Sequence, residues 1–201
     1  MGLFNRGKSH STAATAAPVD PALAALTGEY TIDPAHSRIG FTVRHAMVTN
    51  VRGSFHEYEG KLVLNGSEPA TSEAVLDIKV AGIDTGIADR DAHLRGSDFF
   101  DSEKFPLMSF RSTHAEQLGG DNYRVTGDLT IKDVTRPIAV DLEFNGSATD
   151  PYGNERVGFE GSAEIVRSEW GLTWNTALET GGVMVSDKVK LNLDISAIKT
   201  A

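Results

Sequence analysis

The stretch VMVSDKVKLNLDI, residues 183–195, alternates between apolar and polar side chains over most of its length. Valine, leucine and isoleucine take the odd positions, with the exception of Asp187, while serine, lysine, asparagine and aspartate take the even positions from Ser186 onward. Because successive side chains of a β-strand point to opposite faces, this pattern predicts a strand with one apolar face and one solvent-exposed face.

The same two-residue period recurs through most of the chain. Turn-forming sequences at 65–66, 119–122 and 150–154 separate the segments. A weaker segment at 51–64 changes its apolar parity between Phe55 and Tyr58, which predicts a β-bulge. The total is about eight strands, with the others at 39–43, 74–80, 107–113, 123–131, 138–144 and 157–165.

Short amphipathic strands joined by short turns are typical of an antiparallel sheet. The alternation is lost only over 85–100, where a helical spacing predicts one short helix. We therefore expect an all-β fold with one short helix, either a barrel or a sandwich, and eight antiparallel strands are enough to close into a barrel. Small residues on the inward parity, including Gly53, Gly127, Gly161 and Ala163, favour a hollow interior over a filled one.

Composition removes several classes of protein and of site. The 201 residues include no cysteine, which excludes disulfides, thiolate zinc sites and cysteine nucleophiles. The net charge is −9 and no run of Lys or Arg occurs, so we expect no nucleic-acid partner. The apolar runs are a few residues long, so we expect no membrane span.

The first 27 residues differ in composition from the rest. Residues 1–27 are rich in Ala, Ser and Thr and are predicted to form a flexible arm, whereas residues 28–201 carry the strand pattern and form the barrel domain. Arg6 and Lys8 resemble the start of a secretion signal, but no apolar stretch of sufficient length follows before Pro18. The resulting prediction is a cytoplasmic protein.

The search for catalytic motifs finds no complete match. The chain has no G-x-S-x-G elbow, no P-loop and no paired-histidine zinc motif, so we expect no enzyme, no catalytic residue, no metal and no cofactor. Acidic residues are frequent from Asp84 to Glu103, within and on either side of the predicted helix. They are interpreted as helix caps and a solvated face, with acid-base chemistry or a cation site as the alternative.

Three polar or aromatic residues are candidates for a ligand site. His45 continues the apolar parity of the strand at 39–43, so its ring should point inward. In a structural role it hydrogen-bonds a neighbouring strand or caps the end of the barrel. In a functional role it binds the polar head of a ligand or acts as an axial haem ligand. Trp170 and Trp174 lie four residues apart and either line the mouth of a cavity or pack in the core.

Several motifs in order resemble the YceI-like family over residues 28 to about 199. The resemblance implies a lipocalin-like, eight-stranded antiparallel barrel with a helix on one side, often in a dimer. The barrel would enclose an elongated apolar tunnel for polyisoprenoid or other lipid-like molecules, and the resemblance implies binding without catalysis. Many relatives have a secretion signal where this chain has the arm. The motifs are YTIDPAHS at 30–37, FTVRH at 41–45, VRGSF at 51–55, RDAHLRGSDFF at 90–100, KFP at 104–106, GDLTI at 127–131 and VTRP at 134–137.

The predicted function is therefore binding, sequestration or transport of an elongated apolar ligand, which is a polyisoprenoid, an isoprenoid quinone or a fatty-acid-like amide. The alternatives are a protein-interaction or stress-response module without a lipid ligand, and haem binding through His45. The expected partners are a lipid-like small molecule and a second copy of the chain. The expected ligand-binding residues are Ile39, Phe41, Val43, His45, Phe55, Leu76, Ile78, Met108, Phe110, Leu129, Leu142, Phe144, Phe159, Trp170 and Trp174.

Overall fold

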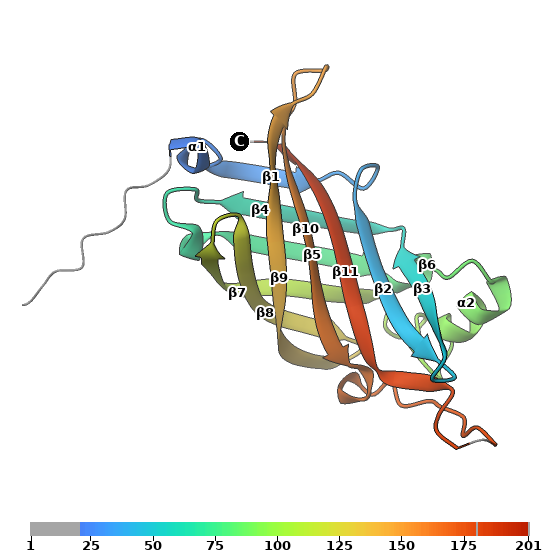
Figure 1. Ribbon diagram of the computed structural model, residues 1–201. Helices are drawn as coiled ribbons and strands as arrows, with labels where there is room; N and C mark the ends of the chain where they lie inside the picture. The colour runs from blue at the N-terminus through green and yellow to red at the C-terminus, as the bar shows by residue number, and fades with distance from the viewer. Residues whose placement is uncertain (1–20, 180, 201) are drawn as a thin grey trace, which may run out of the picture.

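A computed structural model describes residues 21–179 and 181–200. Its main element is a single antiparallel sheet, and its longest helix covers one edge of the molecule (Figure 1). The strands are β1 (Gly28–Ile32), β2 (Arg38–His45), β3 (Thr49–Phe55), β4 (Tyr58–Leu64), β5 (Glu73–Lys79), β6 (Ile83–Asp84), β7 (Leu107–Gly119), β8 (Asn122–Ile131), β9 (Val134–Thr149), β10 (Glu155–Val166) and β11 (Val185–Lys199). The helices are α1 (Pro21–Ala24) and α2 (Ala88–Arg95), with 3-10 turns η1 (Pro69–Thr71), η2 (Val80–Gly82) and η3 (Arg167–Trp170).

Eight of the strands close into a barrel. They follow the order β1-β4-β5-β7-β8-β9-β10-β11, and β11 returns to β1 through the pair of Ile32 with Ala197. β11 is long enough to serve two neighbours, since its earlier residues pair with β2, for example Leu193 with Ile39. β2, β3 and β6 therefore extend the barrel wall beyond the closed ring. The closed ring of eight antiparallel strands and the eight-residue helix α2 confirm the predicted all-β barrel with one short helix.

The strand count differs in detail from the sequence prediction. The segment 51–64 forms two strands, β3 and β4, and not one bulged strand. His56 and Glu57 lie at the corner between them, where His56 N–H donates to Gly82 O and Glu57 O accepts from Lys79 N–H. Alternation alone does not separate a bulge from a corner, because both shift the parity by one residue. β1 was also not among the predicted strands.

The packed chain begins earlier than the predicted domain boundary at residue 28. α1 and the turn after it lie at one end of the barrel, where the Thr27 hydroxyl accepts a hydrogen bond from Gly66 N–H at 3.1 Å. Gly66 lies so close to α1 that an added Cβ would meet Leu23 O at 1.5 Å. The remainder of the predicted arm, residues 1–20, lies outside the described residues.

Helix α2 is fastened to β6 by a buried aspartate. Asp91 is 6% exposed, and its carboxylate accepts hydrogen bonds from the backbone N–H and the hydroxyl of Thr85. Arg95, at the other end of the helix, donates to Ala81 O and Ile83 O, both at 2.9 Å. Asp91 therefore has a structural role, but it is neither a helix cap nor part of a solvated face, since it is buried and α2 begins without a side-chain cap. No helix of the described residues is long and apolar enough to cross a bilayer.

A three-residue ion cluster ties the β1–β2 connection to the β9–β10 hairpin. The Arg156 guanidinium donates to the Asp33 carboxylate at 2.7 Å and to the Asp150 carboxylate at 2.8 Å. The hydrogen bond from Arg156 is the largest cause that lowers the pKa of Asp33. The pKa of Asp150 is lowered by hydrogen bonds from Asn154 first and Arg156 second. Both carboxylates are therefore more acidic in the folded chain than in the unfolded one.

This cluster predicts a loss of stability in acid. Both folded pKa values lie below their unfolded values, so the contribution is complete above about pH 4 and is lost as the pH falls through the folded values. We expect urea unfolding measured from pH 6 down to pH 2 to show a free energy of unfolding that is level above about pH 4 and declines below it. Arg156→Met should flatten that decline, whereas Arg44→Met, which removes an exposed arginine bonded to Asn50, should leave it unchanged. An equally steep decline in Arg156→Met would refute the assignment.

Candidate functional site

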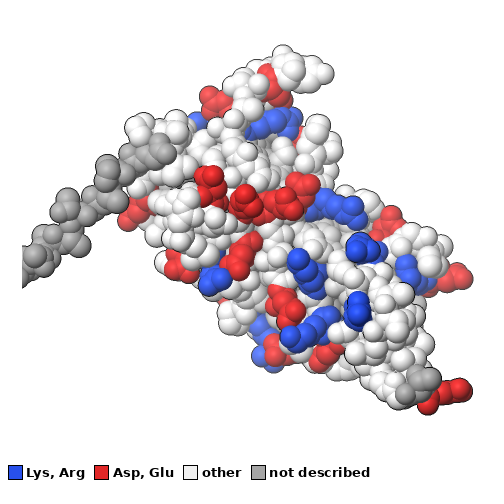
Figure 2. Space-filling view, viewed as in Figure 1, with Lys and Arg blue, Asp and Glu red and all other residues white. Residues whose placement is uncertain are grey.

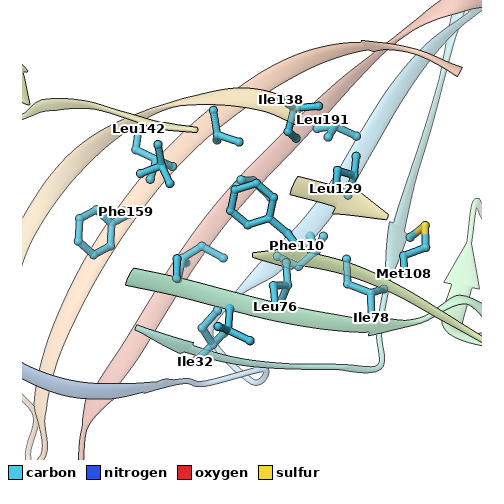
Figure 3. Close-up of a pocket in the computed structure, with 18 of the residues that line it drawn as sticks. Ile32, Leu76, Ile78, Met108, Phe110, Leu129, Ile138, Leu142, Phe159 and Leu191 are labelled. Atoms are coloured by element: carbon cyan, nitrogen blue, oxygen red, sulfur yellow. The ribbon is translucent and has the colours of Figure 1, made fainter. Parts of the chain in front are cut away.

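The barrel encloses a cavity of about 300 Å³. Side chains from opposite walls point toward one another across it, as Figure 3 shows for Ile32 and Leu76 on one side and for Leu142 and Leu191 on the other. The lining contains aliphatic and aromatic residues from every strand of the closed ring. A cavity of this kind can shield hydrocarbon from water, and its walls offer few groups for acid-base chemistry.

Glycines on the wall keep two aromatic rings out of the centre. A Cβ placed on Gly53 would lie 2.4 Å from the tip of the Phe41 ring, and one placed on Gly127 would lie 2.5 Å from the tip of the Phe110 ring. The two rings therefore lie flat against the backbone of a neighbouring strand. The inward glycines that predicted a hollow interior thus act by giving rings a place on the wall.

Burial of the inward side chains agrees with an unfilled centre. Phe41, Leu76, Phe110 and Leu191 face the lumen and are only half-buried, although they belong to the apolar core. Side chains at a closed packing site are covered much more fully, as for Ile83 at 0% exposure. These four side chains therefore face a space, whereas other lining residues are buried, among them Ile78 at 6% and Met108 at 5% exposure.

The structure brings twelve of the fifteen predicted binding residues onto the cavity wall. The three that are absent from the lining are His45, Trp170 and Trp174. Ligand contact for the twelve remains a prediction, and the structure supplies only their common position. The twelve are Ile39, Phe41, Val43, Phe55, Leu76, Ile78, Met108, Phe110, Leu129, Leu142, Phe144 and Phe159.

His45 lies at the end of its strand, away from the lumen. It is the last residue of β2, where it pairs with Thr49 and Val185 and is half-buried. The register shift between β2 and β11 places extra residues on β11, and β2 pairs with β3 without a shift through His45. His45 is therefore absent from the lining because it stands at the end of β2, beyond Val43, the last residue of that strand on the wall.

The two tryptophans pack beside the cavity and do not line it. Trp170 is 2% exposed, and its indole N–H donates to Leu129 O at 3.0 Å. Trp174 packs its ring against Phe99 and His93, with ring centres 5.2 and 4.8 Å apart. Both therefore agree with the alternative in which they contribute to packing.

Sequence reasoning missed lining residues that come from outside the strands. Leu23 and Leu26 reach the cavity from α1 and the turn after it, and Leu94, Phe99 and Phe100 reach it from α2 and the segment that follows. Leu23 and Leu26 fall within the predicted arm, residues 1–27, because its composition is rich in Ala, Ser and Thr. Two leucines so close to the first strand were the one sign in the sequence that this part of the arm packs against the barrel.

Arg167 is the most notable residue that the sequence did not mark. It belongs to the cavity lining, is 5% exposed, and is one of two charged residues on the wall, the other being the exposed Glu73. Its guanidinium donates to four backbone carbonyls, those of Leu172, Trp174, Val185 and Ser186. Burial lowers the pKa of Arg167, and the charge of Asp187 acts in the opposite direction. An arginine nevertheless remains cationic at neutral pH.

The acidic residues near α2 do not converge on one point. Asp84 bonds His56 at 3.0 Å, and Asp98 bonds His93 at 2.9 Å. Among residues 21–179 and 181–200, no group of three His, Cys, Asp or Glu side chains is arranged to hold a metal ion. The described part of the chain therefore presents the apolar cavity as its candidate site.

Comparison with known proteins gives relatives over most of the chain. The chain is 39% identical over 146 residues to a UPF0312 protein of Photorhabdus laumondii, and the alignment covers 72% of this chain and 76% of the relative. It is 37% identical over 163 residues to a UPF0312 protein of Staphylococcus epidermidis, and that alignment covers 81% of this chain and 92% of the relative.

Solved structures share the fold. BcnA of Burkholderia cenocepacia superposes with a TM-score of 0.73 at 24% identity, over 82% of this chain and 98% of that one. A YceI protein of Campylobacter jejuni superposes with a TM-score of 0.67 at 31% identity, over 84% of this chain and 96% of that one. A polyisoprenoid binding domain of Saccharophagus degradans superposes with a TM-score of 0.64 over 85% of this chain and 98% of that one. Its identity is 16%, so it shows a likeness of fold alone.

The match to a family model covers almost all of the barrel. The model of the YceI-like domain matches residues 30–197, from within β1 to within β11. The closed ring of strands and the segments that line the cavity lie almost entirely inside this range. The chain therefore belongs to the YceI-like family.

Proposed function

We propose that this protein binds an elongated apolar molecule, a polyisoprenoid or another lipid-like chain, in the lumen of its barrel. The observation that carries the proposal is the cavity inside the barrel, whose lining is apolar apart from a few residues such as Asn65, Glu73 and Arg167. A related fold from Saccharophagus degradans is a polyisoprenoid binding domain, which supports the same class of ligand. We propose binding without catalysis, and the homodimer and the cytoplasmic location stay predictions.

The energetics of such a site favour a long chain over a compact one. Removing roughly 500 Å² of ligand hydrocarbon from water contributes about 12 kcal/mol before costs. Lost translational and rotational freedom opposes this by at least about 4 kcal/mol. Each methylene contributes about 0.8 kcal/mol, so affinity should rise with chain length until the lumen is filled. Selectivity among chains of similar length should be low, because one methylene changes little.

The test is to identify what the full chain carries when it is purified. We expect organic extraction followed by mass spectrometry to find a lipid in stoichiometric amount, and native mass spectrometry to show the same mass added to the protein. After delipidation, 1-hexadecanol should bind with an affinity that exceeds that of 1-octanol by several orders of magnitude, as the methylene increment requires. A delipidated protein that binds neither alcohol would refute the proposal.

A further inference from the structure

The cavity wall carries one buried positive charge that no acidic side chain contacts. Arg167 is 5% exposed, and its hydrogen bonds go only to backbone carbonyl oxygens. No ion pair to Arg167 is found among the described residues. The carboxylate of Asp187, which is the nearby negative charge, accepts hydrogen bonds from Ser168 instead.

The hydrogen-bonding capacity of Arg167 is also not used up. A guanidinium has five N–H groups. Nε donates to Ser186 O, Nη1 donates to the carbonyls of Leu172 and Trp174, and Nη2 donates to Val185 O at a long 3.4 Å. Four carbonyl oxygens therefore accept from five N–H groups. The N–H group without an acceptor is on Nη2, whose one bond is also the longest of the four. A buried cation in this condition gains from an additional oxygen acceptor.

The position of Arg167 gives the cavity a direction. β10 runs from the hairpin near β1 to Val166, so that it ends away from α1 (Figure 1), and Arg167 follows directly in η3. The α1 end includes the exposed Glu73 and the half-buried Asn65 in its lining. The cavity therefore has a wall of hydrocarbon that includes Arg167 near the end away from α1.

From these observations we infer that the ligand carries an anionic oxygen head group, a carboxylate or a phosphate, which sits against Arg167 while its hydrocarbon tail extends toward α1. This inference rests on the proposed function and specifies which lipid-like molecules the lumen selects. The anion would accept from Nη2 and neutralise the buried charge in a site of low dielectric constant. The outer surface offers many charged side chains of both signs (Figure 2), but the described lining offers no second buried cation.

Arg167 also connects the segment 172–174 to the start of β11 through its hydrogen bonds. The alternative is that this structural role is its whole function. The two roles predict different responses of different ligands. A purely structural arginine affects all ligands of the same tail alike, whereas an arginine that binds the head group affects the charged ligands selectively. The ratio of two affinities separates the roles, because damage to the fold cancels in it.

The experiment measures binding of three probes with one tail to the delipidated full chain at about pH 8, where a carboxylic acid is ionised. The probes are hexadecanoate, hexadecyl phosphate and 1-hexadecanol, and comparing the first two tells which anion is preferred. We expect at least one anion to bind about tenfold to hundredfold more tightly than the alcohol, as a charge-assisted hydrogen bond allows. Arg167→Gln should reduce this ratio to about one while the alcohol still binds.

Two further variants complete the test. Arg167→Lys keeps the charge and should keep part of the preference, while Arg124→Gln removes an exposed arginine paired with Asp141 and should keep all of it. A wild-type ratio of about one, or an unchanged ratio in Arg167→Gln, would overturn the inference, and the wild-type ratio decides even if that variant fails to fold. If 1-hexadecanol also fails to bind, the proposed function itself is wrong, whereas binding of all probes without preference refutes the head-group assignment alone.

Discussion

Ala115→Trp is expected to abolish most of the lipid binding and leave the barrel folded. Ala115 is 5% exposed, belongs to β7 and faces the lumen, opposite Val125 on β8. A tryptophan at this position would occupy space that the ligand tail needs. Displacing about three methylenes would cost about 2.4 kcal/mol, or roughly fiftyfold in affinity.

The measurement is the affinity of the delipidated variant for 1-hexadecanol, with thermal unfolding recorded in parallel. The melting temperature of the ligand-free protein should change by only a few degrees, because the added ring fills existing space. Ala139→Trp is the matched control, since Ala139 is exposed on the outer face of β9 between the inward Ile138 and Val140. Equal losses of affinity in the two variants would show that the lumen does not hold the ligand.

Trp170→Ala is expected to cause the largest loss of stability. Trp170 is 2% exposed beneath the barrel wall, and its indole N–H donates to Leu129 O at 3.0 Å. Removing a buried aromatic side chain typically costs about 3 to 5 kcal/mol, because the neighbours do not collapse fully into the space. For a chain of this length the melting temperature should fall by roughly 10 °C.

Chemical unfolding of two other variants divides this effect into its parts. Trp170→Phe keeps most of the packing and loses the hydrogen bond, so it should cost about 1 kcal/mol from that source. Trp174→Ala removes a half-buried ring of the same type and should cost distinctly less than Trp170→Ala. If Trp174→Ala proved the more harmful variant, the assignment of Trp170 to the core would be wrong.

The strand pattern could be predicted because it depends on local alternation. The segments around Leu129, Leu142 and Phe159 alternate in the sequence and place these residues on the inner wall, as predicted. Such a face requires no knowledge of partners, since a strand always presents alternate residues to one side. The family motifs between residues 30 and 137 added the expectation of a tunnel, and the family match agrees with them.

The predictions that failed depended on where strands end and bend. His45 shares the parity of Ile39 but stands at the end of β2, beyond Val43, the last residue of that strand on the cavity wall. Residues 51–64 form two strands, which alternation alone does not distinguish from one bulged strand. In both places a contact with a distant segment decides the path, and the nearby residues do not encode it alone.

Leu23, Leu26 and Arg167 show what could not have been predicted for the site. Each reaches the cavity from a segment without strand pattern, and Arg167 reads in the sequence as an ordinary arginine at a strand end. Its burial results from four carbonyls that come from residues 172–186. A one-dimensional pattern does not report such an environment, because the partners meet only when the barrel end closes.

By itself, the sequence determined that this protein is built of amphipathic antiparallel strands that each have one apolar face, because alternation is a property of neighbouring residues. The tertiary structure alone decided that the barrel closes through β1 and β11 and that the aromatic side chains of Phe41 and Phe110 lie over Gly53 and Gly127. It also decided that the buried Arg167 adjoins the lumen. These features depend on pairs of segments far apart in the chain, so their free energy exists only once the barrel has closed.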